Sequence, residues 1–515
     1  MIQEHLLSWI VFSPLIALPL ILILPKRSVA FVRWITLLAI TVPLLLSIWL
    51  YFLYNINSPV RPYSPGLPDL QFIENVSWIP MFNIYYFVGV DGLSLPMVIL
   101  TTVVSFVGVI ASWNIPKEKA YFSLYIFLYV GMMGVFVALD FFLFYIFWEV
   151  MLLPMYFLIG IWGGPRREYA AIKFFLYTLF GSVFMLIIMI AFWFFSDVDP
   201  DPNRVVHSFN LIELSKPGTL FGPFQIGAYA RTFAWLALFL GFAIKIPAFP
   251  FHTWLPDAHV EAPTAISVIL AGVLLKMGTY GILRINYFIL PQETAELGFY
   301  FLAALGVVNI IYGALAAMAQ NDLKKLIAYS SVSHMGFVML GMGAFNTAGL
   351  NGAVFQMFNH GTITSMLFLL VGVVYDRAHH RNIDGFGGLA SIVPKYTSFT
   401  AFAFFAGLGL PGLSGFISEA LCFLGGFERY PVLTMISVSG VVLTAAYLLW
   451  AMQRVFLGPP NEEYKDLEEI NIREVISLLP VGAFVLVFGI YPVPMLDLMG
   501  PSLLRIEALI KPFLN

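Results

Sequence analysis

Fourteen apolar stretches, each long enough to cross the roughly 30 Å hydrocarbon core of a bilayer, account for most of the 515-residue sequence. Lipid offers the backbone no hydrogen-bonding partners, so such stretches must fold as helices that pair their N–H and C=O groups internally. The sequence therefore predicts an all-α polytopic membrane protein with about 14 transmembrane helices. The expected spans are 5–25, 31–54, 84–112, 120–139, 141–162, 170–195, 232–250, 264–285, 297–318, 326–345, 353–374, 396–425, 431–456 and 474–496.

Composition agrees with this fold class. Charged residues make up 11% of the chain, against about 25% in soluble domains. The net charge of −3 argues against a nucleic-acid partner, and the single cysteine, Cys422, excludes an internal disulfide and a cysteine-ligated metal cluster within the chain. The longest polar segments, 55–83 and 196–231, are too short to form a soluble domain, so we expect residues 1–515 to be a single membrane domain.

The distribution of lysine and arginine predicts the orientation, because loops on the inner side of a membrane carry an excess of both. If the N-terminus lies outside, the inner connections hold 16 of the 26 basic residues and the outer segments hold eight, with Arg284 counted among the outer ones. Only Lys245 and Lys276 remain, and both lie within expected spans. We therefore expect both termini on the outer side. The N-terminal MIQEHLLSW lacks a basic region and a cleavage site, so it is interpreted as part of the first span.

The stretch from Gly241 to Gly278 combines these two lysines with Pro247 and Pro250. A proline cannot donate a backbone hydrogen bond, so the carbonyls four residues earlier are expected to be free. Freed backbone groups are tolerated in a membrane only where protein or a watery cavity surrounds them. A buried ammonium costs at least about 2.5 kcal/mol at mid-membrane. A broken helix and a charge at one depth indicate an ion path.

Other spans carry ionisable groups too. Glu149 lies in the fifth span and Glu419 in the twelfth, where the glycines between Gly407 and Gly415 predict a second broken helix; His334 and His360 lie in the tenth and eleventh spans. Two acids and two lysines can also form buried ion pairs that merely fix helix packing, but such pairs do not explain two broken helices beside charges. A single histidine within a span is as often a packing residue as a functional one.

Three further polar positions are interpreted as structural. Asp257 is expected to cap a helix start rather than to receive protons at an entrance. Asp140 begins the fifth span and is expected to be an interfacial residue. His379 and His380 are expected to lie on a solvated inner loop.

Four motifs run from the fifth to the twelfth span: FWEVMLLPMY, KIPAFPFHTWLPDAHVEAPTAISVILAGVLLK, AYSSVSHMG and GLPGLSGF. With these motifs the chain resembles the antiporter-like, proton-translocating membrane subunits of respiratory complex I (NADH-quinone oxidoreductase). The resemblance implies fourteen helices with two inverted five-helix repeats, each containing one broken helix. The repeats correspond to 120–285 and 297–456, preceded by the N-terminal helices 1–112 and followed by 474–515, a last helix and a short tail.

Within that family the residue in the twelfth helix distinguishes the paralogues. It is a lysine in the L and N types and a glutamate in the M type. With Glu419 at this position, the chain resembles subunit M and its mitochondrial equivalent, chain 4. The long lateral helix of the L type has no counterpart expected beyond residue 496.

The resemblance also implies roles for the buried charges. Glu149 would pair with Lys245, protons would pass to Lys276 and along His334 and His360, and Glu419 would release them. L-, N- and K-type subunits of the complex would be its neighbours in the membrane. NADH, FMN, iron–sulfur clusters and quinone would be bound by partner subunits of the complex, so this chain is expected to bind no cofactor or metal itself. The expected location is the inner membrane of a bacterium.

Three alternatives stay open. The first is a subunit of a multi-component cation/proton antiporter or of a membrane-bound hydrogenase, whose members usually carry lysine where this chain has Glu419. The second is a membrane scaffold whose charges only hold helices together. The third is a haem-binding cytochrome with His334 and His360 as ligands.

Overall fold

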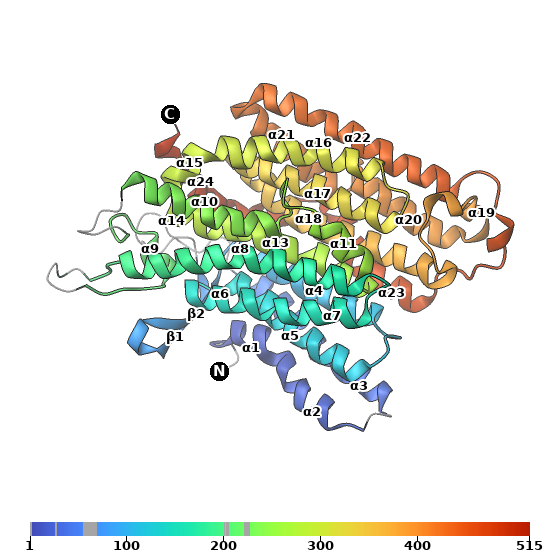
Figure 1. Ribbon diagram of the computed structural model, residues 1–515, viewed down its shortest axis with the longest axis horizontal. Coiled ribbons are helices and arrows are strands. Elements are labelled where there is room, and N and C mark those ends of the chain that lie inside the picture. Colours follow the sequence, from blue (N-terminus) through green and yellow to red (C-terminus); the bar gives the residue numbers. More distant parts are fainter. Residues whose placement is uncertain are drawn as a thin grey trace.

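A computed structural model describes residues 3–25, 28–54, 70–199, 201, 205–220 and 227–514. Long helices run side by side along one direction, and both ends of the chain lie toward the same end of the bundle (Figure 1). We call this end the terminal end; it also carries the two strands found in the described residues, β1 (Gln71–Ile79) and β2 (Ile84–Val90).

Eleven helical segments of the described part are long and apolar enough to cross a membrane, and each coincides with an expected span. They are Leu6–Ile23 (α1 Leu6–Phe12, α2 Ala17–Ile23), α3 Val29–Leu53, α5 Glu118–Val137, Phe141–Trp162 (α6 Phe141–Val150, α7 Leu152–Trp162), α8 Arg167–Phe195, Thr264–Ile289 (α12 Thr264–Ile269, α13 Leu275–Gly281, α14 Tyr287–Ile289), Pro291–Met318 (α15 Pro291–Gly298, α16 Leu305–Met318), α17 Leu323–Gly343, α18 Thr347–Ala378, α22 Pro431–Phe456 and α23 Ile472–Ile490. This confirms a membrane protein that is mostly helical.

The other three expected spans coincide with shorter or interrupted helices. These are α4 (Leu95–Ala111), α10 (Ala228–Lys245) with α11 (Trp254–Glu261), and α20 (Pro394–Gly407) with α21 (Ser414–Arg429). The remaining helices are α9 (Leu211–Leu214), α19 (Leu389–Ile392) and α24 (Val493–Ile510).

The expectation of a wholly helical chain and of a helical span over 84–112 is wrong in part. Residues 84–90, IYYFVGV, form β2, which pairs antiparallel with β1, and the helix starts only at Leu95. Aromatic and β-branched residues favour a strand, and a short apolar run does not reveal by itself whether it is strand or helix. The backbone N–H of Leu139 donates to the carbonyl of Phe87 at 2.8 Å, which attaches the hairpin to the α5–α6 connection.

The C-terminal residues form a helix rather than the short tail that the sequence suggested. Helix α24 packs against α18, α14 and α15. Its buried side chains recur every three or four residues, the spacing of one helix face; they are Met495, Leu498, Met499, Ser502, Leu503, Ile506 and Ile510. The segment was missed because it is amphipathic and too polar on its other face to count as a span.

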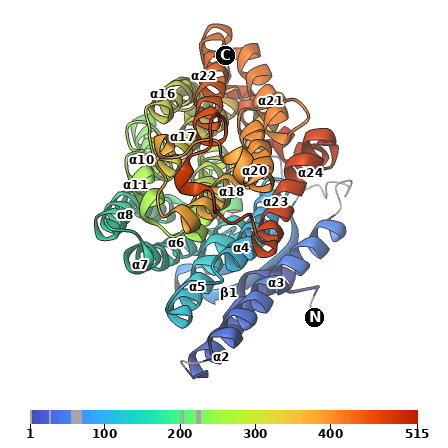
Figure 2. The same cartoon turned by 90° about the vertical axis from the view of Figure 1, so that its right-hand side faces the viewer.

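Helix α18 lies in the middle of the bundle, in contact with α4, α12, α17, α20, α21, α23 and α24 (Figure 2). The segment Thr264–Ile289 is likewise buried throughout. By contrast, α3 and α22 lie at the periphery and expose large apolar side chains such as Phe31, Trp34, Met435 and Val442, as a surface facing lipid requires. The centre of the bundle is therefore the place where charge is best shielded from lipid and water.

Both expected helix breaks are present, and protein groups take up the backbone that they free. Helix α10 ends at Lys245, and the chain turns through residues 246–253 before α11 begins. The Ala243 carbonyl, expected to be free, accepts from the N–H of Ala248 at 2.8 Å, and the Ile244 carbonyl accepts from the Trp254 indole at 2.8 Å. Asn309 of α16 accepts from the N–H of Phe249 at 2.8 Å. The first break is thus sealed by protein.

The second break separates α20 from α21 at residues 408–413. Gly409 and Gly412 have φ values of +79° and +94° there, a conformation that costs glycine little and other residues much. A side chain at Gly409 would also place its Cβ 3.0 Å from a carboxylate oxygen of Glu419. The break therefore brings backbone directly against the buried acid.

Candidate functional site

Lys245, the last residue of α10, is buried with a 1% exposed surface. Its ammonium lies 3.6 Å from the sulfur of Met151 and over the rings of Trp148 and Phe174, 5.3 and 5.4 Å from their centroids. Cation–π contacts of this kind stabilise a desolvated ammonium by up to about 2 kcal/mol each. An aromatic and sulfur cage, rather than a carboxylate, is the immediate surrounding of Lys245.

The expected direct pair of Glu149 and Lys245 is not formed: among the described residues no ion pair within 4.0 Å joins them. Consecutive residues on a helix point about 100° apart. Trp148 and Met151 face Lys245, so Glu149 is turned aside. One carboxylate oxygen of Glu149 is buried without a hydrogen-bond partner. The two charges still attract each other, but at longer range.

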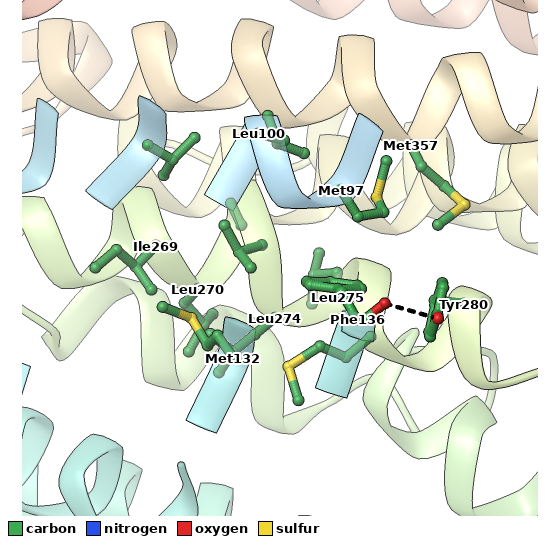
Figure 3. Packing of buried hydrophobic residues seen from close by; sticks show 14 of the residues in the cluster. Met97, Leu100, Met132, Phe136, Ile269, Leu270, Leu274, Leu275, Tyr280 and Met357 are labelled. Atoms are coloured by element: carbon green, nitrogen blue, oxygen red, sulfur yellow. Dashed lines mark hydrogen bonds between the residues drawn. The ribbon is translucent and has the colours of Figure 1, made fainter. Parts of the chain in front are cut away.

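Lys276 is fully buried in α13, between two π-helical segments, Leu270–Leu274 and Ile282–Asn286. π-Helical segments are rare in proteins, and those that occur are often found at functional sites. The ammonium donates to the Ala271 carbonyl at 2.5 Å and lies 2.6 Å from Nδ1 of His360 in α18. The apolar packing around this helix, from α4, α5 and α18, is seen in Figure 3. Lys276 thus shares a hydrogen bond with a titratable partner in an otherwise apolar part of the interior.

The contacts continue from His360 to the second break. The rings of His360 and His334 are 5.8 Å apart between centroids, and Nδ1 of His334 lies 3.1 Å from Oε1 of Glu419. A small cavity is lined by both histidines and Glu419, with Ser330, Gln356 and Thr364 among its other walls. The structure therefore brings together four of the six predicted site residues, in the order Lys276, His360, His334 and Glu419, while Lys245 and Glu149 lie apart from that line.

Gln356 of α18 was not singled out from the sequence, yet it touches two members of the site, His334 and Glu419. Its amide nitrogen lies 3.4 Å from Nδ1 of His334 and 3.4 Å from Oε1 of Glu419, and its amide oxygen accepts from Ser418 at 2.5 Å. Gln356 precedes His360 by four residues and so shares its helix face. That spacing was the available signal.

The hydroxyls expected to hold water behave differently. Ser331, Ser333 and Thr362 each donate to a backbone carbonyl, of Ile327, Ile310 and Asn359 respectively. The Ser331 and Thr362 bonds stay within their own helices, as is usual for Ser and Thr, whereas Ser333 of α17 reaches across to α16. The cavity-lining Thr364 likewise donates to a backbone carbonyl, that of His360, and Ser330 bonds the Tyr447 hydroxyl at 2.7 Å.

A second polar region lies on the side of Lys276 away from the terminal end. His259 of α11 is fully buried, stacks on Phe368 with centroids 4.6 Å apart, and has no hydrogen-bond partner on either ring nitrogen. Lys324 donates to the Ala262 carbonyl at 2.5 Å and lines a cavity of about 510 Å³ together with Glu261 and Arg473. Lys324 was counted only among the basic residues of the inner connections, because it lies at the start of α17.

Three structural interpretations need correction. Asp257 does not cap a helix start but pairs with Lys173 at 2.7 Å and Arg166 at 3.8 Å. Asp140 is not merely interfacial: it is fully buried and accepts from the N–H groups of Phe142 and Leu143, capping α6. His380 is packed, because it bonds Tyr464 at 2.5 Å and stacks on Phe386.

Among the described residues, no group of three or more His, Cys, Asp or Glu side chains is arranged to hold a metal ion. Residues 138–444, which include both breaks and all six predicted site residues, match the family described as NADH:quinone oxidoreductase/Mrp antiporter, TM.

Relatives extend this match to almost the whole chain. NADH-quinone oxidoreductase subunit M of Rhodobacter capsulatus is 42% identical over 506 residues, which is 97% of this chain and 96% of that protein. F(420)H(2) dehydrogenase subunit M of Methanosarcina mazei is 42% identical over 433 residues, 84% of this chain and 86% of that protein. A chain of respiratory complex I from Thermus thermophilus with bound NADH is 27% identical and superposes with a TM-score of 0.84 over 99% of this chain and 100% of that one. The chain belongs to the NADH:quinone oxidoreductase/Mrp antiporter family of membrane subunits, and its relatives over nearly their whole length include NADH-quinone oxidoreductase subunits M.

Proposed function

We propose that this chain is the M-type proton-translocating membrane subunit of an NADH-quinone oxidoreductase. It moves protons across the membrane while other subunits oxidise NADH and reduce quinone. The relatives support the assignment. The observation that carries it is the line of buried titratable groups from Lys276 to Glu419. Lys276 lies 2.6 Å from His360, a small cavity is lined by both His360 and His334, and His334 lies 3.1 Å from Glu419.

These groups have the chemistry that a relay needs. The Lys276 ammonium donates to Nδ1 of His360, and an imidazole can accept a proton on one ring nitrogen and release another from the second. Nε2 of His360 has no protein partner, so its proton can pass through water in the cavity to His334. His334 then passes a proton to the Glu419 carboxylate, which the second break holds against backbone.

Lys245 and Glu149 act at the other end of the relay. The ammonium in its aromatic cage and the carboxylate beside it attract each other without touching. A change in their separation or charge alters the field at Lys276, which is a coupling free energy between sites. No hydrogen-bonded route between Lys245 and Lys276 exists among the described residues, so protons passing between them require water or a rearrangement.

The proposal includes the finer architecture of the family: fourteen spans and two inverted repeats. In each predicted repeat the broken helix is the fourth of five, α10–α11 in 120–285 and α20–α21 in 297–456. With the terminal end facing outward, both termini lie on the outer side of a bacterial inner membrane. L-, N- and K-type subunits are the neighbours, and NADH, FMN, iron–sulfur clusters and quinone are bound elsewhere in the complex.

A second candidate function is that of a subunit M in a dehydrogenase whose electron donor is F(420)H(2) and not NADH. The identity to the F(420)H(2) dehydrogenase subunit equals that to the Rhodobacter subunit. Purification of the tagged chain from native membranes separates the two. NADH-oxidising partners and NADH-driven acidification of vesicles are expected; partners without NADH oxidation, or ion exchange without any redox activity, would exclude the proposal.

A further inference from the structure

The helical segment that carries Lys276 contains a second buried cation, Arg284. Lys276, Tyr280 and Arg284 follow one another at four-residue spacing, so they share a helix face that runs from the centre toward the terminal end. Arg284 was counted among the outer loop cations, but only 3% of its surface is exposed. Its guanidinium lies 2.6 Å from Oδ1 of Asp91, which is 1% exposed. A complete ion pair is therefore buried between Lys276 and the terminal end.

Neighbouring groups fix this pair on both sides. Oδ1 of Asp91 also accepts from the N–H groups of Leu93 and Ser94 at the start of α4. Arg284 Nε donates to the Tyr280 hydroxyl at 3.1 Å, which itself donates to the Phe136 carbonyl of α5 at 2.9 Å, drawn in Figure 3. The pair thus ties α4, α5 and the Lys276 helix together.

Close packing covers the pair toward the terminal end. The N–H of Gly92 donates to Ser502 of α24 at 2.9 Å, and a Cβ at Gly92 would lie 2.3 Å from the Leu498 carbonyl oxygen. The guanidinium also stacks over the rings of Tyr280 and Phe288. Little space is left for water along this face.

We propose that the Asp91–Arg284 pair is a proton seal that prevents Lys276 from exchanging protons directly with the outer side. This inference rests on the proposed function, in which Lys276 carries a proton. A guanidinium keeps its proton in proteins and therefore cannot pass one on. Asp91 makes the buried charge tolerable. With this direction closed, a proton on Lys276 is left with His360 as its acceptor.

The test measures passive proton permeability, so that it does not depend on redox-driven pumping. Purified complex is reconstituted into liposomes with an entrapped pH dye, and a potassium diffusion potential is imposed without NADH. Asp91→Asn with Arg284→Gln removes both charges while keeping hydrogen-bonding amides. Arg284→His keeps an ion pair but introduces a group that can release its proton. Thr294→Val is the control, because Thr294 accepts a buried neutral hydrogen bond from Trp235 at 2.8 Å.

Arg284→His is expected to leak about tenfold faster than the control, because an imidazolium can release the proton that a guanidinium holds. A leak in Arg284→His supports the withheld proton, and a leak in the double variant supports the role of the buried ion pair in closing this direction. Both variants assembled and as tight as Thr294→Val would overturn the seal. Failure of wild-type complex to acidify vesicles with NADH would instead refute the proposed function and leave the permeability result intact.

Discussion

Glu419 is the residue at which the relay is most sharply testable, because its partner is known from the structure. Its carboxylate lies 3.1 Å from Nδ1 of His334, and both side chains are 8% exposed. Glu419→Gln preserves the shape and a hydrogen bond but cannot accept a proton. Glu419→Lys keeps a group that can carry a proton and reverses its charge. Glu419→Gln therefore removes the ability to accept a proton, and Glu419→Lys reverses the charge, at the same contact.

The magnitude follows from the short distance. Two unit charges about 4 Å apart interact by about 4 kcal/mol at an effective dielectric of about 20. In the wild type this interaction favours a proton on His334 beside a charged Glu419. In Glu419→Lys it opposes a charged His334 beside a charged lysine. If that cost enters the barrier, transfer slows by about a thousandfold. A lysine at this position, natural in the L and N types, is therefore not expected to function here without a change at His334.

The assay is the number of protons moved per NADH oxidised in liposomes that contain the reconstituted complex. We expect Glu419→Gln and Glu419→Lys both to lose most pumping and to slow NADH–quinone turnover, while Glu419→Asp retains part of both. Glu428→Gln is the matched control, because Glu428 is an exposed carboxylate in the same helix that bonds Asn346 at 2.9 Å. Wild-type pumping in Glu419→Lys would refute the charge argument, and wild-type pumping in all three Glu419 variants would remove the residue from the route.

The remaining predictions concern the other predicted groups. Lys276→Met and His360→Gln, which each break the 2.6 Å contact, should lower pumping by at least about a hundredfold if the transfer follows general acid–base behaviour; retained pumping in either variant would place the relay elsewhere. Lys245→Met should abolish most pumping in an assembled complex, whereas Glu149→Gln should be milder because the two groups are not in contact; the opposite order would indicate that they pair during the cycle. An accessibility tag at Asp199 should react only from the outer side, and one at His380 only from the inner side. If both tags react from the same side, the helices between them are miscounted.

The sequence predicted the spans well because hydropathy alone determines which segments can cross lipid. It failed where a segment was neither fully apolar nor fully polar. Residues 84–90 and 493–510 illustrate the two cases: a short apolar run that is a strand, and an amphipathic helix that packs on the bundle. Arg284 illustrates a third, since a basic residue near a helix end is usually interfacial, whereas this one is buried against Asp91. A partner nearly two hundred residues away leaves no local signal.

For the site, the sequence predicted residue types and depth but not contacts. Lys276, His334, His360 and Glu419 stand on four different helical segments, and only the packing of these segments brings the four side chains into one line. Gln356 was overlooked because an amide carries no charge whose burial demands an explanation. The Glu149–Lys245 pair was expected on charge alone. It does not form because the Glu149 side chain points away from the helix face that Trp148 and Met151 turn toward Lys245.

The close packing of glycines separates the two halves of the predicted route. A Cβ at Gly278 would lie 2.7 Å from both the Phe242 carbonyl oxygen and the Ile246 side chain, so α13 and α10 touch backbone to backbone near Lys245 and Lys276. Such contact leaves no room for a water molecule. On the other side of Lys276 the contacts are polar and continue to Glu419. The proposed half-route from Lys276 to Glu419 therefore lacks only water in the small cavity between the two histidines. The proposed half-route from Lys245 to Lys276 is closed by packing, which is where a pump needs a barrier that opens only during its cycle.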